Sequence, residues 1–161
     1  TLIGVDRIFP YVCTCGVELD ALPLLDDGGF SRFGLDVIKE MALRRAVDAL
    51  HDRLLDEFKL DHKASMNPGS GDRDLWPLEE QGALFRLLGD VRDAIGVTLT
   101  DSWLMLPNKS VSGFYFKTET GYRNCRLCKR ESCPNRSAPF DPKLWAESMV
   151  GHGTPDCGST G

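Results

Sequence analysis

The sequence predicts a protein of mixed helix and strand content that ends in an irregular segment. Three observations support this: a long apolar stripe at helical spacing, two later runs rich in β-branched and aromatic residues, and a cysteine-rich stretch without periodicity. The 161 residues suffice for one domain with an apolar core. We therefore expect helices and strands to pack around a single core.

Residues 1–31 look irregular, apart from a short apolar stretch at residues 8–12. Residues 34–60 are predicted to form a long helix, because apolar residues recur there at steps of three and four. The members of this stripe are Leu43, Val47, Leu50, Leu54 and Phe58. His51 lies on the same helix and is expected to be a surface histidine.

Residues 65–77 have loop chemistry, with Asn-Pro and Gly-Ser-Gly steps. Residues 77–96 predict a second helix that begins at a proline and stops at Gly96. The residues it is expected to bury are Leu84, Leu88, Val91 and Ile95.

Strands are predicted at residues 97–106 and 110–116. Gly113, inside the second strand, indicates a bulge or a close approach by another group. Phe114 and Phe116 are expected in the core, whereas Tyr115 between them is a candidate to face a cofactor. Periodicity fades from residue 118, and residues 141–150 predict a short last helix.

The composition is that of an ordinary globular protein, with a net charge of −5 at pH 7. An acidic protein lacks the basic face expected of a general nucleic-acid binder. The sequence has no apolar run long enough to span a bilayer and no basic-then-apolar leader. We expect a cytoplasmic protein with no nucleic-acid or membrane partner.

The cysteines carry the main functional signal. Three of the six form a C-x2-C-x4-C motif: Cys125, Cys128 and Cys133. Zinc and iron–sulfur cubanes both take four ligands, so a distant cysteine is expected to complete the set. Cys15 is preferred, because Gly16 after it allows a tight turn, and Cys13 and Cys157 remain alternatives.

A [4Fe–4S] cluster is the favoured metal centre. Pro134 follows Cys133, a pairing frequent at cluster ligands, and residues 117–136 carry six cations against two carboxylates. Positive charge stabilises a negatively charged thiolate site, but it does so for zinc as well. Zinc therefore stays an alternative, as do disulfides or free thiols.

The stretch "LTDSWLMLPNKSVSGFYF" resembles the C-terminal reactivation domain of cobalamin-dependent methionine synthase. The likeness covers roughly residues 35–117, and small anaerobe proteins with a cysteine-rich C-terminus look most similar. It implies an α+β fold with an antiparallel sheet and packed helices, and a role near corrinoid chemistry. The implied cofactor-contact residues are Pro68, Gly69, Ser110, Ser112, Gly113 and Tyr115.

Three positions depart from the resemblance. Ser65 and Ser70 stand where the synthase carries an arginine and a tyrosine, and Arg44 stands where it carries an acidic residue. Those family residues help to hold S-adenosylmethionine. We therefore expect that this chain does not bind S-adenosylmethionine in the family manner.

The resemblance and the cysteines together predict three parts: a reactivation-domain-like core at residues 1–117, a cluster-binding segment at 118–145 and a tail at 146–161. They predict an iron–sulfur protein of one-carbon metabolism that transfers electrons to, or reductively reactivates, a corrinoid protein or methyltransferase, in contact with its cobalamin. The alternatives are a zinc-stapled assembly subunit and an S-adenosylmethionine-binding reactivation domain. No residue is assigned a catalytic role.

Overall fold

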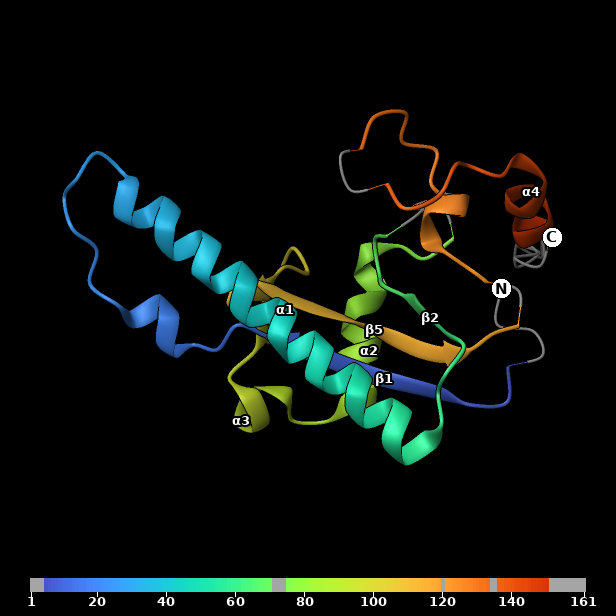
Figure 1. Ribbon diagram of the computed structural model, residues 1–161, viewed down its shortest axis with the longest axis horizontal. Coiled ribbons are helices and arrows are strands. Elements are labelled where there is room, and N and C mark those ends of the chain that lie inside the picture. The colour runs from blue at the N-terminus through green and yellow to red at the C-terminus, as the bar shows by residue number, and fades with distance from the viewer. Residues whose placement is uncertain (1–4, 71–74, 120, 134–135, 151–161) are drawn as a thin grey trace, which may run out of the picture.

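A computed structural model describes residues 5–70, 75–119, 121–133 and 136–150 of the chain. It has the predicted α+β class, with an antiparallel sheet and four α-helices. Figure 1 shows the long helix α1 crossing the sheet, with the cysteine-rich segment and α4 gathered near one end of the molecule. None of the helices in the described part combines the length and apolar character that a membrane span requires.

The main sheet has three strands in the order β1-β5-β2, so the last strand in the chain is the central one. These are β1 (Ile8–Thr14), β2 (Lys63–Met66) and β5 (Ser110–Lys117). Both outer strands run antiparallel to β5. The sequence predicted β5, but β1 falls in the stretch expected to be irregular and β2 overlaps the expected loop. Both outer strands were therefore missed.

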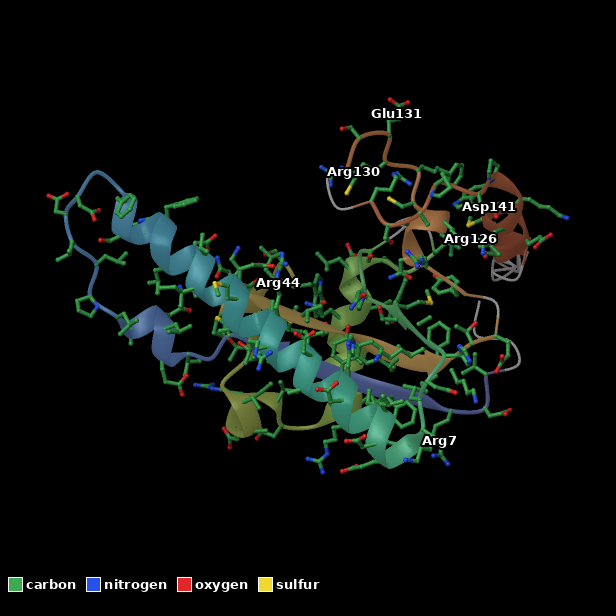
Figure 2. The ribbon with its side chains drawn as sticks, viewed as in Figure 1. Arg7, Arg44, Arg126, Arg130, Glu131 and Asp141 are labelled. Atoms are coloured by element: carbon green, nitrogen blue, oxygen red, sulfur yellow. The ribbon has the colours of Figure 1, made fainter. Side chains whose placement is uncertain are left out.

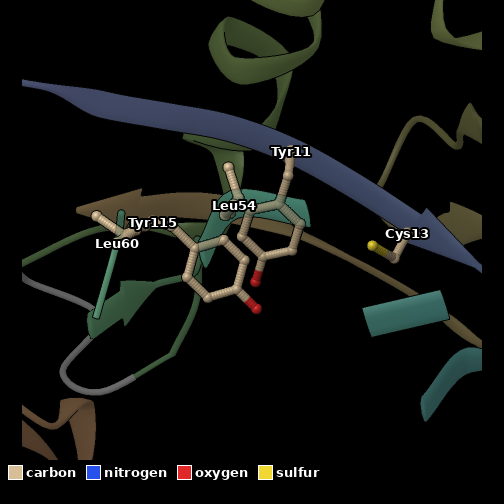
Figure 3. Close-up of a cluster of buried hydrophobic side chains, with 5 residues drawn as sticks. All are labelled: Tyr11, Cys13, Leu54, Leu60 and Tyr115. Carbon is tan, nitrogen blue, oxygen red and sulfur yellow. The ribbon is translucent and has the colours of Figure 1, made fainter. Parts of the chain in front are cut away.

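The long predicted helix is present as α1 (Phe30–Phe58), which is 29 residues long. Its C-terminal half covers one face of the sheet, where Leu54 packs with buried residues of both β1 and β5. Figure 3 shows this cluster: Tyr11, Cys13, Leu54, Leu60 and Tyr115. The predicted apolar stripe is confirmed, although Phe58 at its end stays 45% exposed.

The opposite face of the sheet packs against the C-terminal part of the chain. Ala64 and Phe116 pair across β2 and β5, and both lie in a second core cluster. The other buried members are Leu75, Tyr122 and Leu127. Helix α4 (Pro142–Val150) closes this cluster with Leu144, Trp145 and Met149, and it confirms the predicted last helix.

The second predicted helix is interrupted at Gly89. A 3-10 turn η2 (Leu78–Glu80) leads into α2 (Gln81–Leu88), and a separate short helix α3 (Val91–Ile95) follows. Gly89 has a φ of +83°, and the Asp90 side chain accepts a hydrogen bond from the Asp93 N–H as a new N-cap.

The break changes which side chains are buried. Leu84 and Val91 are buried as predicted, but Ile95 is 40% exposed. The predicted strand at residues 97–106 is a small hairpin of β3 (Thr98–Leu99) and β4 (Met105–Leu106). A further 3-10 turn, η1 (Glu18–Ala21), precedes α1.

Candidate functional site

The cysteine motif is built around one buried leucine. Leu127 is 1% exposed and lies in the second core cluster, in the 3-10 turn η3 (Asn124–Leu127). Cys125 lies in the same turn, and Cys128 follows directly after it. Both thiols are half-buried. The apolar anchor therefore holds the C-x2-C turn against the core while its cysteines stay near the surface.

The guanidinium of Arg136 joins the parts of the cysteine segment. Its Nη1 donates to the carbonyl oxygens of Cys125 at 3.2 Å and Ala138 at 3.3 Å. Its Nη2 donates to the carbonyl of Cys128 at 3.3 Å and also to that of Arg130. A planar guanidinium has five N–H donors in a fixed arrangement, which suits several carbonyls at once. Arg136 thus orders an irregular backbone that has no regular ladder of hydrogen bonds.

The thiol of Cys125 lies where negative charge is favoured. Its Sγ accepts hydrogen bonds from the Ser137 hydroxyl at 3.3 Å and from the Ser137 N–H at 3.4 Å. These bonds, with a smaller contribution from the nearby Arg136 charge, lower the pKa of Cys125 below its usual value. The thiolate is the form of cysteine that binds metal ions.

The segment is also tied to α4. Arg126 and Asp141 form an ion pair at 2.6 Å, and the Asp141 N–H donates to the Arg126 carbonyl. The Asp141 carboxylate accepts from the Leu144 N–H at the start of the helix. In Figure 2, Arg126 and Asp141 lie close together, whereas Arg130 and Glu131 lie at the outer tip of the loop. The base of the loop is therefore anchored and its tip faces outward.

Cys15 lies far from this segment. Its N–H donates to the Lys109 carbonyl, which places it next to the start of β5, whereas the cysteine segment follows the end of that strand at Lys117. An eight-residue strand spans roughly 23 Å at about 3.3 Å per residue. Cys13 is buried beneath α1, and Cys157 lies outside the described residues.

The structure thus keeps three predicted ligands in one segment and separates the fourth from them. Within the residues that the structure describes, no three or more His, Cys, Asp or Glu side chains are grouped closely enough to hold a metal ion. Cys133 is half-buried like the other two, in irregular backbone after the tip of the loop. The four-cysteine metal site remains a prediction.

The predicted cofactor-contact residues of β5 are mostly packed inside the fold. Ser112 is 2% exposed, and its hydroxyl donates to the side-chain carbonyl of Gln81 at 3.1 Å. A Cβ at Gly113 would lie 2.2 Å from the Met66 carbonyl oxygen. The predicted close approach at Gly113 is therefore real, and the group that approaches is the end of β2.

The remaining contact candidates are less enclosed. The half-buried Ser110 hydroxyl donates to the Pro107 carbonyl at 2.7 Å and lies 2.9 Å from the Thr14 hydroxyl, with which it shares a second hydrogen bond. Pro68 is buried, and Gly69 beside it is exposed with a φ of +74°. Of the six candidates, Ser110 and Gly69 are thus the two that reach the surface.

Tyr115 belongs to a polar cluster that sequence reasoning missed. Its ring stacks on Tyr11 with centroids 4.4 Å apart, and its hydroxyl is 2.5 Å from Nε2 of His51. The Asn67 side-chain amide donates to the Tyr11 hydroxyl at 2.8 Å. Tyr115 therefore lies in the core under α1, and its predicted cofactor contact stays a prediction. His51 is half-buried by its contact with Tyr115 and is not fully exposed on the helix surface.

The charges of this cluster follow from its burial. Desolvation raises the pKa of both tyrosines, so both hydroxyls stay protonated at neutral pH. Desolvation and the nearby Lys63 lower the pKa of His51. A signal was available in the sequence, because His51 is four residues after Val47 and three before Leu54, on the apolar stripe.

Residues 66–135 match the family described as vitamin B12 dependent methionine synthase, activation domain. The match includes β5 and all three cysteines of the motif, and it begins and ends later than the resemblance seen in the sequence. A search of curated proteins found no match to the chain. The predicted resemblance is confirmed: over residues 66–135 the protein is methionine synthase activation-domain-like, which fits a role in corrinoid-related methyl transfer or reactivation.

Proposed function

We propose that this protein supplies electrons for the reductive reactivation of a corrinoid protein or methyltransferase, through a [4Fe–4S] cluster bound by the cysteine segment. The activation-domain match supports the corrinoid context. The observation that carries the metal-centre part is the setting of Cys125, whose Sγ accepts two hydrogen bonds from Ser137 that favour the thiolate.

The residues of the segment suit such a centre. Cys125, Cys128 and Cys133 would hold three corners of the cluster, and a bound cluster would supply single electrons. Hydrogen bonds to a ligating sulfur and nearby positive charge raise a cluster's reduction potential, and Ser137 and Arg136 would provide both. Leu127 and the Arg126–Asp141 pair would keep the site in place on the core.

The fourth ligand is the part of the proposal that the geometry does not support in its predicted form. Cys15 lies at the other end of β5, and burial and the Asp20 carboxylate raise its pKa, opposite to Cys125. Cys15 and Cys157 are therefore both candidates for the fourth ligand, and substituting each in turn distinguishes them.

The first experiment is to purify the chain without oxygen and measure iron, sulfide, zinc and visible absorption. We expect about four irons and four sulfides per chain, as a cubane requires. Cys125→Ala, Cys128→Ala and Cys133→Ala should each lose the cluster, whereas the matched control Cys13→Ala should keep it. Comparing Cys15→Ala with Cys157→Ala then identifies the fourth ligand.

A second experiment separates the cluster from its function. The reduced protein is mixed with a cobalt(II) corrinoid protein, and the corrinoid spectrum is followed for reduction. Electron transfer that is lost in Cys125→Ala supports the proposal. A loaded cluster that reduces no corrinoid would refute the reactivation role while leaving the cluster intact.

Zinc is the second candidate, because the same thiols and the anchoring of the segment to the core suit a structural staple. It predicts a colourless protein with one zinc per chain. Removing that metal should loosen residues 124–133 and change no redox activity.

A further inference from the structure

A chain of hydrogen bonds between four side chains runs from α1 across the sheet to the end of β2. Nε2 of His51 on α1 lies 2.5 Å from the Tyr115 hydroxyl on β5. The hydroxyls of Tyr115 and Tyr11 share a hydrogen bond, and Figure 3 shows both on the same side of the stacked rings. The Tyr11 hydroxyl in turn accepts from the Asn67 side-chain amide at 2.8 Å. These four residues are called the hydrogen-bond chain below.

The direction of the hydrogen-bond chain is fixed at its Asn67 end. The side-chain nitrogen of Asn67 also donates to the Ser112 carbonyl oxygen at 2.7 Å, so the nitrogen, and not the amide oxygen, must face the sheet. Tyr11 therefore accepts from Asn67 and gives its own proton to Tyr115, its other neighbour. Tyr115 has a single proton, which is left for Nε2 of His51. That nitrogen is the acceptor, so the His51 ring is neutral and carries its proton on Nδ1.

A proton on Nε2 of His51 would reverse this order. Nε2–H would donate to Tyr115, and Tyr115 would donate to Tyr11. The Tyr11 oxygen would then accept from both Tyr115 and Asn67, and its own proton would have no acceptor within the hydrogen-bond chain. A buried donor without an acceptor is costly. Turning the Asn67 amide over would relieve Tyr11, but it would place the amide oxygen against the Ser112 carbonyl. Protonation of His51 therefore conflicts with the bonds that Asn67 makes.

Asn67 is also the residue that holds a turn against the sheet. Its backbone carbonyl accepts from the Ser70 N–H at 3.0 Å, which closes the turn. A Cβ at Gly113 would lie 2.7 Å from the Asn67 side-chain nitrogen, so the bare glycine lets Asn67 reach β5. Between its two ends the turn carries Pro68 and Gly69, two of the predicted cofactor-contact positions. The Asn67 side chain thus connects these positions to the hydrogen-bond chain.

The surroundings of His51 favour its neutral form. Partial burial and the positive charge of Lys63 on β2 lower the pKa of His51, and Asp48 and Asp52 on α1 oppose this shift without cancelling it. The tyrosine hydroxyls contributed by β1 and β5 stay protonated, because burial raises their pKa. The folded-state pKa of His51 lies below that of the unfolded chain. Its stabilising contribution is therefore complete above the unfolded pKa and is lost as the pH falls through the folded one.

We propose that protonation of His51 is a switch that releases the Asn67 turn from the sheet. When His51 is neutral, the hydrogen-bond chain is complete and the turn is held against β5. When His51 is protonated, Asn67 gives up its bonds to Tyr11 and Ser112, and the turn moves away from the strand. The hydrogen-bond chain contains no cysteine, so the switch acts whether or not a metal centre is bound.

Nuclear magnetic resonance on the full chain tests this proposal. The nitrogen shifts of the His51 ring at about pH 7.5 identify its tautomer, and we expect the proton on Nδ1. The pH is then lowered to about 5, through the range in which histidine titrates. The side-chain amide of Asn67 and the backbone amides of Gly69 and Ser70 should shift with the same midpoint as the His51 ring. A neutral ring that carries its proton on Nε2, or turn amides that do not follow the His51 midpoint, overturns the proposal.

Three variants separate the switch from a general effect of acid. His51→Gln supplies a carbonyl that can accept from Tyr115 but does not titrate, so the turn resonances should lose their response to pH. Tyr115→Phe leaves His51 able to titrate but removes the link, so the response should be lost again. His62→Gln is the matched control: the His62 side chain is 67% exposed and lies outside the hydrogen-bond chain, so the response should remain. A response that survives in His51→Gln or Tyr115→Phe, or that disappears in His62→Gln, refutes the switch.

Discussion

The sheet and the cysteine segment lie side by side but are ordered in different ways. On β5, Tyr115 and Phe116 face opposite sides of the sheet, and both are at most 5% exposed. In the described residues from 124 to 133, Leu127 is the one buried side chain. The segment is otherwise held by polar contacts, of which three backbone carbonyls that accept from Arg136 and the Arg126–Asp141 ion pair are examples.

The difference shows that the two regions are stabilised by different kinds of contact. Apolar burial fixes the sheet, and polar contacts hold the cysteines half-exposed, where a metal or a redox partner can reach them. Regions that carry function are often drawn from the less stable parts of a structure. The substitutions below test whether the two regions respond separately.

The largest expected effect is on the core shared by both regions. Phe116→Ala should lower the free energy of unfolding by about 3–5 kcal/mol, because Phe116 is 2% exposed and leaves a cavity. Chemical denaturation measures this. Phe114→Ala is the control: Phe114 is half-buried and stacks on Trp76, so it should cost clearly less. Equal losses of stability in the two variants would show that the half-buried Phe114 contributes as much to the core as the buried Phe116 does.

Alkaline pH should weaken the sheet through Cys13. Burial raises the pKa of Cys13 from 9.0 to about 11, so the folded state holds this proton more tightly than the unfolded state. The stabilisation is complete below pH 9 and is lost as the pH rises through 11, about 3 kcal/mol at about 1.4 kcal/mol per pKa unit.

Stability measured from pH 8 to 11 checks this prediction. Cys13→Ala, which has no thiol to titrate, should lose less stability over that range than the wild type. Parallel curves for the two proteins would mean that the buried tyrosines alone account for the alkaline loss.

A smaller effect is expected where the end of β2 lies against Gly113 of β5. Gly113→Ala should cost about 1–3 kcal/mol, because the new Cβ would overlap the Met66 carbonyl and the Asn67 side chain. Denaturation gives the size of the loss. Hydrogen exchange should show weaker protection at residues 63–66, and unchanged protection there would contradict the close approach.

The smallest global effect is expected in the cysteine segment. In the metal-free protein, Arg136→Ala should change total stability by about 1 kcal/mol or less, yet speed amide exchange at residues 124–133 about tenfold. Arg136→Lys keeps the positive charge but lacks the planar guanidinium donors, so it should restore little of the slow amide exchange. Arg130→Ala, which removes a cation without breaking the carbonyl contacts, should leave the exchange unchanged. Faster exchange in β5 would mean that the two regions are one cooperative unit.

The elements that could be predicted are those with a long, regular pattern. Helix α1 was found because apolar residues from Leu43 to Leu54 recur at helical spacing along one face. Strand β5 was found because its sequence is rich in β-branched and aromatic residues. The helix break at Gly89 was missed, although the Asp90 cap after it was a usable signal. A glycine alone only lowers helix propensity, and here the left-handed backbone of Gly89 decided the outcome.

The short strands and the site were harder to read for a physical reason. β1 carries Pro10, which has no N–H for a ladder and is tolerated because β1 lies at the sheet edge. The cysteine motif could be located from its spacing, but the position of Cys15 depends on which strands pair. Arg136 was counted among the cations of the segment, but its contacts could not be predicted, because its partners are backbone carbonyls, which every sequence contains.

The placement of the last strand at the centre of the sheet has a consequence for how the chain folds. β1 and β2 have no partner until β5, about 100 residues after β1, has been made. At roughly 5–20 residues per second, a ribosome takes about 5–20 s to cover that stretch. β1 has an unpaired edge throughout this time and β2 for its second half, and such edges can associate with other chains. Early helix formation by α1, whose contacts are local, would give the nascent chain a scaffold before the slow non-local pairing closes the sheet.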